Sequence, residues 1–337
     1  MAHEVESMAY AGEVPWHGLG YQVGDEMTPE EMMIAAQLKW TVSKRPAYTI
    51  EDSKWHEGVG LLSCPDDHFV VRDSDRKILS HCGNDYVPFQ NEEVMSFFKK
   101  FVANSTMKMH TAGSLKDGKE IWGLAKLDAS FTLAGGDRVE GYLLIHSPHV
   151  AGKALTIKFT PVRVVCNNTL TYAINKTSDR GVFRILHLQM FDDEIKRAAE
   201  EALGISKEAI DIYKEQAEFL SGKRYTNTDL QHYIAELFQP QLLVERAKEN
   251  IRREVPMDDE FKQTASALYE MVDTQPGAQM ASSKGTWWGA FNVVTFYFDH
   301  HRREAMQGGR LHSAWFGTGA NTKVKALNKA IEYAKVA

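Results

Sequence analysis

Cysteine is scarce in this sequence, with three among 337 residues. A secreted domain held together by disulfides needs more, so a disulfide framework is excluded. Long hydrophobic runs are also missing. The longest apolar-rich stretch, 287–298, contains Gly289, Asn292 and Thr295, whereas a membrane-spanning helix needs about 18 or more apolar residues. The N-terminus is acidic where a signal peptide would be basic. These absences predict a cytoplasmic protein that does not enter a membrane.

The spacings that hold metals and phosphates are missing too. The sequence has no Cys-x-x-Cys or His-x-x-x-His pair, and Cys64 and Cys82 are eighteen residues apart. We therefore expect no structural metal site. Neither of the two glycine-rich phosphate-binding patterns, Gly-x-x-x-x-Gly-Lys and Gly-x-Gly-x-x-Gly, follows a predicted strand. No cofactor is expected.

One glycine-rich turn comes near a phosphate-binding arrangement. Residues 315–323 place Gly317 and Gly319 before a helix that carries Lys323 and Lys325. The free amides of such a helix start can bind an anion. The alternative is an ordinary helix start that is capped by a polar side chain.

Charge is unevenly distributed, although the net charge is only −6 and the composition, with 43% hydrophobic and 25% charged residues, is that of a globular protein. Residues 151–190 hold six lysines and arginines and one acid, whereas residues 191–280 hold eleven bases and nineteen acids. A basic segment can form a local anion site even in an acidic protein. Alternatively, its bases pair with the acids of 191–280.

Alternating and turn-bounded patterns predict strands in the first half of the chain, and amphipathic patterns predict helices in the second. Residues 1–24 have little periodicity and are expected to form an ordered loop or arm rather than a helix or strand. Thr28 and Glu31 predict a capping box, and Asn91 is expected to cap a second helix. The predicted strands are 40–50, 68–71, 77–80, 107–114, 119–127, 139–146, 154–165 and 181–188. The predicted helices are 28–39, 91–102, 191–203, 207–220, 228–238, 242–253, 258–272, 287–303 and 323–336, with a polar loop at 277–285.

This order of elements predicts an α+β fold: an antiparallel sheet with packed helices in the first half and a helical second half. The predicted domains are 1–190, a sheet-rich α+β domain with an N-terminal arm, and 191–337, a mainly helical region packed on it.

The basic segment is the strongest candidate for a nucleic-acid interface. Bases displayed from a sheet could follow a phosphate backbone, while rings between them stack on bases. Lys158 alternates with Ile157 and Phe159, so it faces the opposite side of its strand. The phosphate-binding candidates are Lys153, Lys158, Arg163, Arg180, Arg184, Lys323 and Lys325, and the base-contacting candidates are Trp16, His17, Tyr172 and Phe183.

Cys166 offers a different chemistry, because it follows a predicted strand and precedes Asn167. A nucleophilic cysteine needs a base and a lowered pKa, and Arg163, three residues earlier along the strand, faces away from it. A small buried residue at a strand end is the competing interpretation.

Four segments carry a family resemblance. They are residues 15–20 (Pro-Trp-His-Gly-Leu-Gly), 161–170 (Pro-Val-Arg-Val-Val-Cys-Asn-Asn-Thr-Leu), 291–295 (Phe-Asn-Val-Val-Thr) and 315–317 (Trp-Phe-Gly). In this order they resemble the phage and plasmid-like proteins grouped as domain of unknown function 932. The resemblance covers nearly the whole chain. It implies an accessory protein of a phage or other mobile element, and no activity comes with the family name.

The predicted order of hairpins and helix also resembles the core of single-strand annealing proteins, which form rings or filaments on single-stranded DNA. We therefore expect an oligomeric, non-enzymatic protein that binds single-stranded DNA and promotes annealing or recombination. Two alternatives remain open. One is an enzyme acting on nucleotides or nucleic acid through Arg163, Cys166 and Asn167. The other is a protein that binds a host factor through the acidic helices of 191–273.

Overall fold

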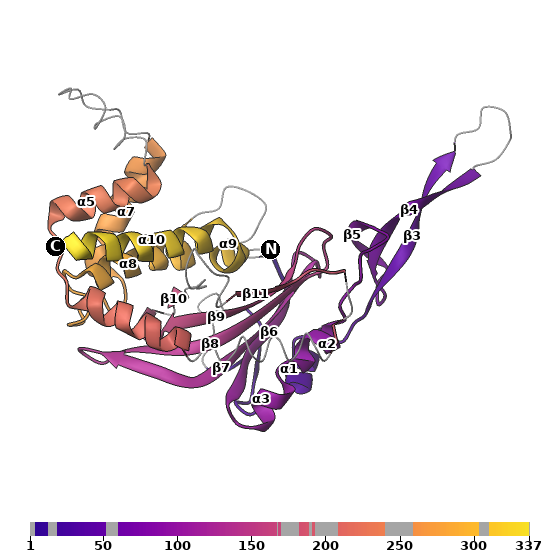
Figure 1. The fold of residues 1–337 in the computed structure, drawn as a ribbon, viewed down its shortest axis with the longest axis horizontal. Coiled ribbons are helices and arrows are strands. Elements are labelled where there is room, and N and C mark those ends of the chain that lie inside the picture. The colour runs from indigo at the N-terminus through magenta and orange to yellow at the C-terminus, as the bar shows by residue number, and fades with distance from the viewer. Residues whose placement is uncertain are drawn as a thin grey trace. The chain divides into compact units, whose positions relative to one another are not determined.

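The structure is a computed structural model that describes residues 4–12, 19–51, 60–166, 168–169, 182–188, 191–192, 208–239, 259–302 and 310–336. Strands dominate the first half of the chain and helices the second (Figure 1). The predicted α+β class is confirmed, and so is the division between a sheet-rich half and a helical half. None of the described helices is long and apolar enough to cross a membrane.

The first half contains β1 (Val5–Ala11), β2 (Tyr21–Val23), α1 (Pro29–Ala35), β3 (Val42–Glu51), β4 (Gly60–Arg72), β5 (Lys77–Gly83), α2 (Asn91–Ser96), α3 (Lys99–Ala103), β6 (Met107–Leu115), β7 (Glu120–Leu133), β8 (Asp137–Pro148), β9 (Leu155–Arg163), a 3-10 turn (Val164–Cys166), β10 (Asn168–Thr169) and β11 (Val182–Ile185). The second half contains a helical stretch at 208–221, α5 (Asn227–Phe238), α7 (Asp259–Thr274), α8 (Trp287–Phe296), a π-helical turn (Tyr297–His301), α9 (Arg310–Phe316) and α10 (Thr318–Val336).

The strands form two sheets. The larger has the order β10-β9-β8-β7-β6-β1-β2, with β11 also paired to β9, and the smaller has the order β3-β4-β5. The hairpin of β6 and β7 confirms the prediction for 107–127, and its turn carries positive φ angles at Lys116, Asp117 and Gly118. That left-handed geometry suits the aspartate and the glycine of the turn.

The N-terminal arm predicted at 1–24 is wrong for its described residues. β1 pairs antiparallel with β6 and parallel with β2, so both segments belong to the large sheet. Ala9 and Ala11 are buried in the core. The strand was not recognised because Glu6 and Ser7 interrupt its apolar alternation, and they find polar partners within the fold.

Most of the predicted elements form with shifted ends. Thr28 caps α1 through a capping box with Glu31, as predicted. The second helix instead takes Gln90 as its cap, and it divides into α2 and α3. α10 begins several residues before the predicted start at 323. Most of 191–203 and all of 242–253 lie outside the described residues.

Two compact units share the chain. One comprises 1–128, 142–159 and 174–206, and the other 129–141, 160–173 and 207–337. The chain therefore passes between the units along β7, β8 and β9, and residues at the ends of these strands belong with the helical part. The single division at residue 190 remains a prediction from the sequence.

The first unit has its core between the large sheet and the short helices. Buried residues of α1 and α2 pack with inward-facing residues of the strands, because every second strand residue points to that face. The core includes Met32, Met33, Phe89, Val94, Phe98, Ile121, Ile145, Leu155, Ile157 and Ile185.

The second unit is organised around α8. Every residue from Trp287 to Thr295 is buried in this helix, which agrees with its apolar composition on all sides. Trp287 contacts Tyr233 of α5 and Tyr333 of α10, with ring centroids 5.5 and 5.3 Å apart. These aromatic contacts connect the helices of the unit.

Candidate functional site

Two of the predicted phosphate-binding cations, Lys158 and Arg184, lie on the paired strands β9 and β11. Lys158 pairs with Val182 and Thr156 pairs with Arg184. Because alternate residues of a strand share a face, Lys158 and Arg184 lie on the same side of the sheet. The residues between them on β9 and β11 face the other side, where they enter the core of the first unit.

Lys158 is an unusual surface cation. It is half-buried, and no described residue forms a hydrogen bond or an ion pair with it. Burial, and then the positive charge of Arg184, lower the pKa of Lys158 from 10.5 to about 8. A bound anion would counter both effects, because it would supply the opposite charge that the ammonium group lacks.

Lys153 follows β8 and is exposed, but its ammonium group is engaged. It donates to Glu120 Oε1 at 2.8 Å, and Lys116 donates to the same oxygen at 3.2 Å. His146 lies 3.2 Å from the other oxygen. Glu120 is fully buried, so two lysines neutralise one buried carboxylate. Lys153 therefore reaches a phosphate only at the expense of this contact.

The prediction that Arg163 contacts phosphate is wrong in this structure, because its guanidinium is buried and does not face a ligand. Only 2% of the residue is exposed, and the guanidinium binds Asp137. The strand buries its arginine while the following Val164 is 42% exposed, the reverse of what residue polarity suggests. The enzyme hypothesis also needs an Arg163 that a substrate can reach, and in this structure the residue is buried.

The predicted roles of Phe183, in contacting bases, and of Lys323, in binding phosphate, also disagree with the structure. Phe183 packs against the core of the first unit, on the side of the sheet opposite to Lys158, so it does not stack beside that lysine. Lys323 is fully buried on α10, and its ammonium group donates to Asp299 at 2.6 Å. Burial lowers the pKa of Lys323 although Asp299 raises it. Lys325 remains exposed and donates to the carbonyl of Glu236 at 3.2 Å.

Several predicted residues cannot be placed. Trp16, His17, Tyr172, Arg180 and Asn167 lie outside the described residues, as does the side chain of Cys166. Among the residues that are described, no group of three or more histidines, cysteines, aspartates or glutamates is arranged to hold a metal ion.

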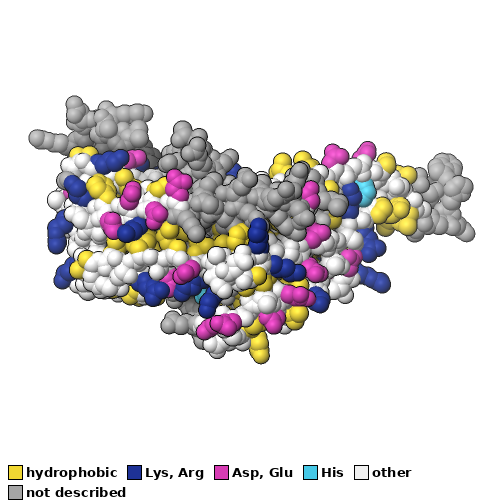
Figure 2. All heavy atoms as spheres, turned by 60° about the horizontal axis from the view of Figure 1, so that its bottom comes forward, with side chains coloured by type: hydrophobic (Ala, Val, Ile, Leu, Met, Phe, Trp, Pro, Cys, Tyr) yellow, Lys and Arg dark blue, Asp and Glu magenta, His cyan; other side chains and the backbone are white. Residues whose placement is uncertain are grey.

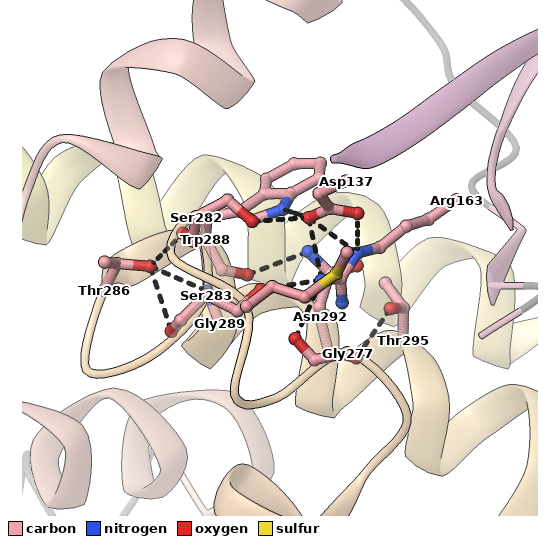
Figure 3. Close-up of polar contacts among 11 residues, drawn as sticks. Asp137, Arg163, Gly277, Ser282, Ser283, Thr286, Trp288, Gly289, Asn292 and Thr295 are labelled. Carbon is pink, nitrogen blue, oxygen red and sulfur yellow. Dashed lines mark hydrogen bonds and ion pairs between the residues drawn. The ribbon is translucent and has the colours of Figure 1, made fainter. Parts of the chain in front are cut away.

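A second polar centre, in the helical unit, was not recognised from the sequence. Asp137 Oδ2 accepts hydrogen bonds from Arg163 Nη2 at 2.8 Å, Ser282 Oγ at 2.7 Å and Trp288 Nε1 at 2.9 Å (Figure 3). Arg163 Nε also donates to Oδ1, at 2.8 Å. The same Nη2 donates to Ser283 Oγ at 2.7 Å. All five side chains are buried.

The loop before α8 brings these groups together. Thr286 caps the helix by accepting from the amide of Gly289, and its hydroxyl contacts the carbonyls of Ser282 and Ser283 (Figure 3). Gly277, at φ +78°, offers its carbonyl to Arg163. The loop was predicted from its small polar residues; its two adjacent serines, Ser282 and Ser283, are a signal that could have indicated buried hydrogen bonding but was not used.

This Asp137–Arg163 centre connects parts of the chain that are distant in sequence. One of the segments with the family resemblance, 161–170, supplies Arg163, and another, 291–295, lies in α8, the helix that supplies Trp288. Each charged group is satisfied by several buried partners, as a stable buried pair requires. The centre connects β8, β9, the loop and α8 through hydrogen bonds. Its polar groups bind one another and do not face a ligand.

Two buried histidines in the first unit predict a stability that depends on pH. Burial lowers the pKa of His149 to about 3 and that of His187 to about 4, from 6.5. A lowered histidine pKa means that the unfolded chain binds protons which the folded chain rejects, so stability falls as pH decreases from 6.5 towards 4. His187 stacks between Tyr86 and Phe89, and His187→Phe should therefore reduce the loss of thermal stability over this range. An unchanged pH dependence would contradict this assignment.

The comparisons with known proteins give one family and no relative of known role. No curated protein and no solved structure matches the chain. A family model described as "Domain of unknown function (DUF932)" matches residues 78–329, which span β5 to α10 and include both Lys158 and the Asp137–Arg163 centre. The chain belongs to the DUF932 family.

Proposed function

We propose that this protein binds single-stranded DNA and promotes strand annealing, as an oligomer that serves a phage or other mobile element. The supporting observation is the half-buried Lys158 beside Arg184, on one face of the sheet. A lysine that is held near a like charge, with no acid among the described residues paired to it, costs the folded state free energy. Cations whose pKa is lowered in this way are common at functional sites, where a negatively charged ligand restores the charged form.

A phosphate backbone fits this face better than a neutral ligand. Lys158 and Arg184 are diagonal neighbours across two strands, so one negatively charged strand could contact both. Single strands lie on sheet surfaces in several families of binding proteins, with cations along the backbone. The family resemblance to mobile-element proteins favours DNA over a small anion as the ligand.

Binding should be measured by fluorescence anisotropy with a labelled oligothymidine, at several salt concentrations. Lys158→Gln and Arg184→Gln should each weaken binding and reduce the slope of log affinity against log salt by about 0.7, the contribution of one phosphate contact on a single strand. Lys39→Gln is the matched control, because Lys39 is an exposed lysine of the same unit, and it should bind as the wild type does. Equal salt slopes for all four proteins would overturn the proposal.

Lys158→Met gives an independent readout that does not need DNA. Removing a half-buried cation that lies beside the like charge of Arg184 should raise the free energy of unfolding by about 0.5–2 kcal/mol, while DNA binding weakens. A variant that gains stability and loses affinity identifies the lysine as part of a binding site, whereas a variant that loses both would indicate a structural role. Annealing itself is tested by the rate at which two complementary labelled strands pair in the presence of each protein.

A further inference from the structure

The end of β11 and the residues after it send alternate side chains to opposite sides of the sheet. Ile185 is buried in the core of the first unit. His187 is 3% exposed and stacks between Tyr86 and Phe89, with ring centroids 5.0 and 4.2 Å away. The carbonyl of His187 also accepts from the amide of Val87 at 2.7 Å. These contacts fix the odd-numbered side chains of this segment on the core side.

The even-numbered side chains therefore point outward, and two of them are leucines. Leu186 is 57% and Leu188 is 61% exposed, and they follow the exposed Arg184 at intervals of two residues. Residues two apart on an extended strand lie about 6.6 Å from each other, so the first leucine is next to the guanidinium-bearing residue. We call Lys158, Arg184, Leu186 and Leu188 the outer strip. It places apolar side chains directly beside two cations.

The outer strip carries positive charge and no negative charge. Lys158 lies on the same side of the sheet as Arg184 and has no ion-pair partner among the described residues. Neither β9 nor residues 182–188 contain Asp or Glu, whereas cations and acids are interspersed on the face of the molecule that Figure 2 shows. Charge complementarity therefore favours an anionic partner, and the exposed leucines favour a partner that also has apolar surface.

A single DNA strand has both properties, because each nucleotide carries a charged phosphate and a base with an apolar face. In a duplex the base faces are stacked on one another and are closed to side chains. Aromatic side chains cover base faces in many proteins that bind single strands, and leucine contacts the same faces through dispersion attraction. The predicted base-contacting residue Phe183 faces the core instead, so other side chains must contact the bases if this face binds DNA.

We propose that Leu186 and Leu188 contact the bases of a single strand whose phosphates bind Lys158 and Arg184. The inference rests on the proposed function and adds to it the residues that touch the bases. It predicts a preference for single strands over duplex, since only an unpaired base exposes its face to the leucines. Contacts with base faces do not distinguish one base from another, so binding is expected to depend little on sequence.

A strand without bases separates base contacts from phosphate contacts. Leu186→Ala and Leu188→Ala should each weaken binding of oligothymidine about threefold to tenfold, as expected when part of a leucine contact is removed. Binding of an abasic strand of equal length should not change. The salt dependence of oligothymidine binding should stay that of the wild type, because no phosphate contact is lost. Lys158→Gln should instead weaken binding of both strands.

Ile34→Ala is the matched control for the leucine variants. Ile34 is 50% exposed on α1, and this helix packs on the core side of the large sheet, opposite to the outer strip. The control should bind both strands as the wild type does. The leucine variants should remain folded because both positions are exposed, and circular dichroism checks this.

The outcomes distinguish this inference from the proposed function. If the leucine variants bind oligothymidine as tightly as the wild type does, the leucines do not contact bases, and the inference is overturned while the proposed function stands. If the wild type binds no DNA, both are overturned. A further arm uses vesicles that contain anionic lipid. Wild-type protein that binds these vesicles, together with leucine variants that do not, would identify a membrane surface as the partner and overturn the inference.

Discussion

Asp137→Asn should destabilise the protein by about 3–5 kcal/mol, because it leaves the buried guanidinium of Arg163 without a counter-charge. The amide keeps the size of the carboxylate, so no cavity accompanies the change. Ser282 and Trp288, which also donate to Asp137, lose part of their hydrogen bonding. Urea unfolding followed by tryptophan fluorescence measures the effect, since Trp288 lies in the centre itself.

The matched control is Asp128→Asn, which removes the same charge from an exposed aspartate on β7. It should change the free energy of unfolding by no more than about 0.5 kcal/mol. Arg163→Met in the Asp137→Asn background should cost less than the two single changes added together, because the second change removes the charge that the first left unpaired. If Asp137→Asn were as stable as Asp128→Asn, the buried pair would have no structural role.

Gly289→Ala should cost about 3 kcal/mol or more, although alanine is the better helix former by about 1 kcal/mol. A Cβ at position 289 would lie 2.1 Å from the carbonyl oxygen of Ser283 and 3.0 Å from its carbonyl carbon. These are backbone atoms of a buried loop and cannot rotate away. The loop must shift, and Ser283 Oγ then moves from the guanidinium of Arg163. Packing therefore outweighs helix propensity here.

Gly24→Ala is the control for this prediction. Its Cβ would meet no heavy atom within 4 Å and its φ is not positive, so the change should be neutral or slightly stabilising, by up to about 1 kcal/mol. Thermal unfolding of both variants against the wild type measures the difference. Gly289→Ala with wild-type stability would show that the loop before α8 is free to move, against its dense hydrogen bonding.

The sequence predicts those features that depend on residues close together in the chain. The turn at 116–118, the capping box of Thr28 and the alternation that separates Lys158 from Ile157 are all local, and each is confirmed. The family model also confirms the family assignment, which was predictable because the family's motifs are read directly from the sequence.

The Asp137–Arg163 centre could not be predicted in the same way. Its members come from β8, β9, a loop and α8, and nothing in a local pattern states that a carboxylate at 137 will meet an indole at 288. Lys323 shows the same limit, since an amphipathic helix normally exposes its lysines, and here Asp299, distant in the sequence, pairs with the buried ammonium group. Arg163 misled for a further reason: a basic residue between valines suggests an exposed cation. Here the arginine is buried, and Val164, in the turn after the strand, is 42% exposed instead.

The place of β1 in the large sheet sets an order of events during synthesis. Met8 pairs with Gly113, so β1 leaves the ribosome about a hundred residues before its neighbour β6 does. At common rates of translation that interval is roughly 5–20 s. During this time β1 has at most its parallel neighbour β2 beside it, and its other edge stays open to the first binder that arrives. Chaperones that hold extended, partly apolar segments are therefore expected to act on the nascent chain before residue 115 emerges, and a pause in translation downstream of β6 would favour correct pairing.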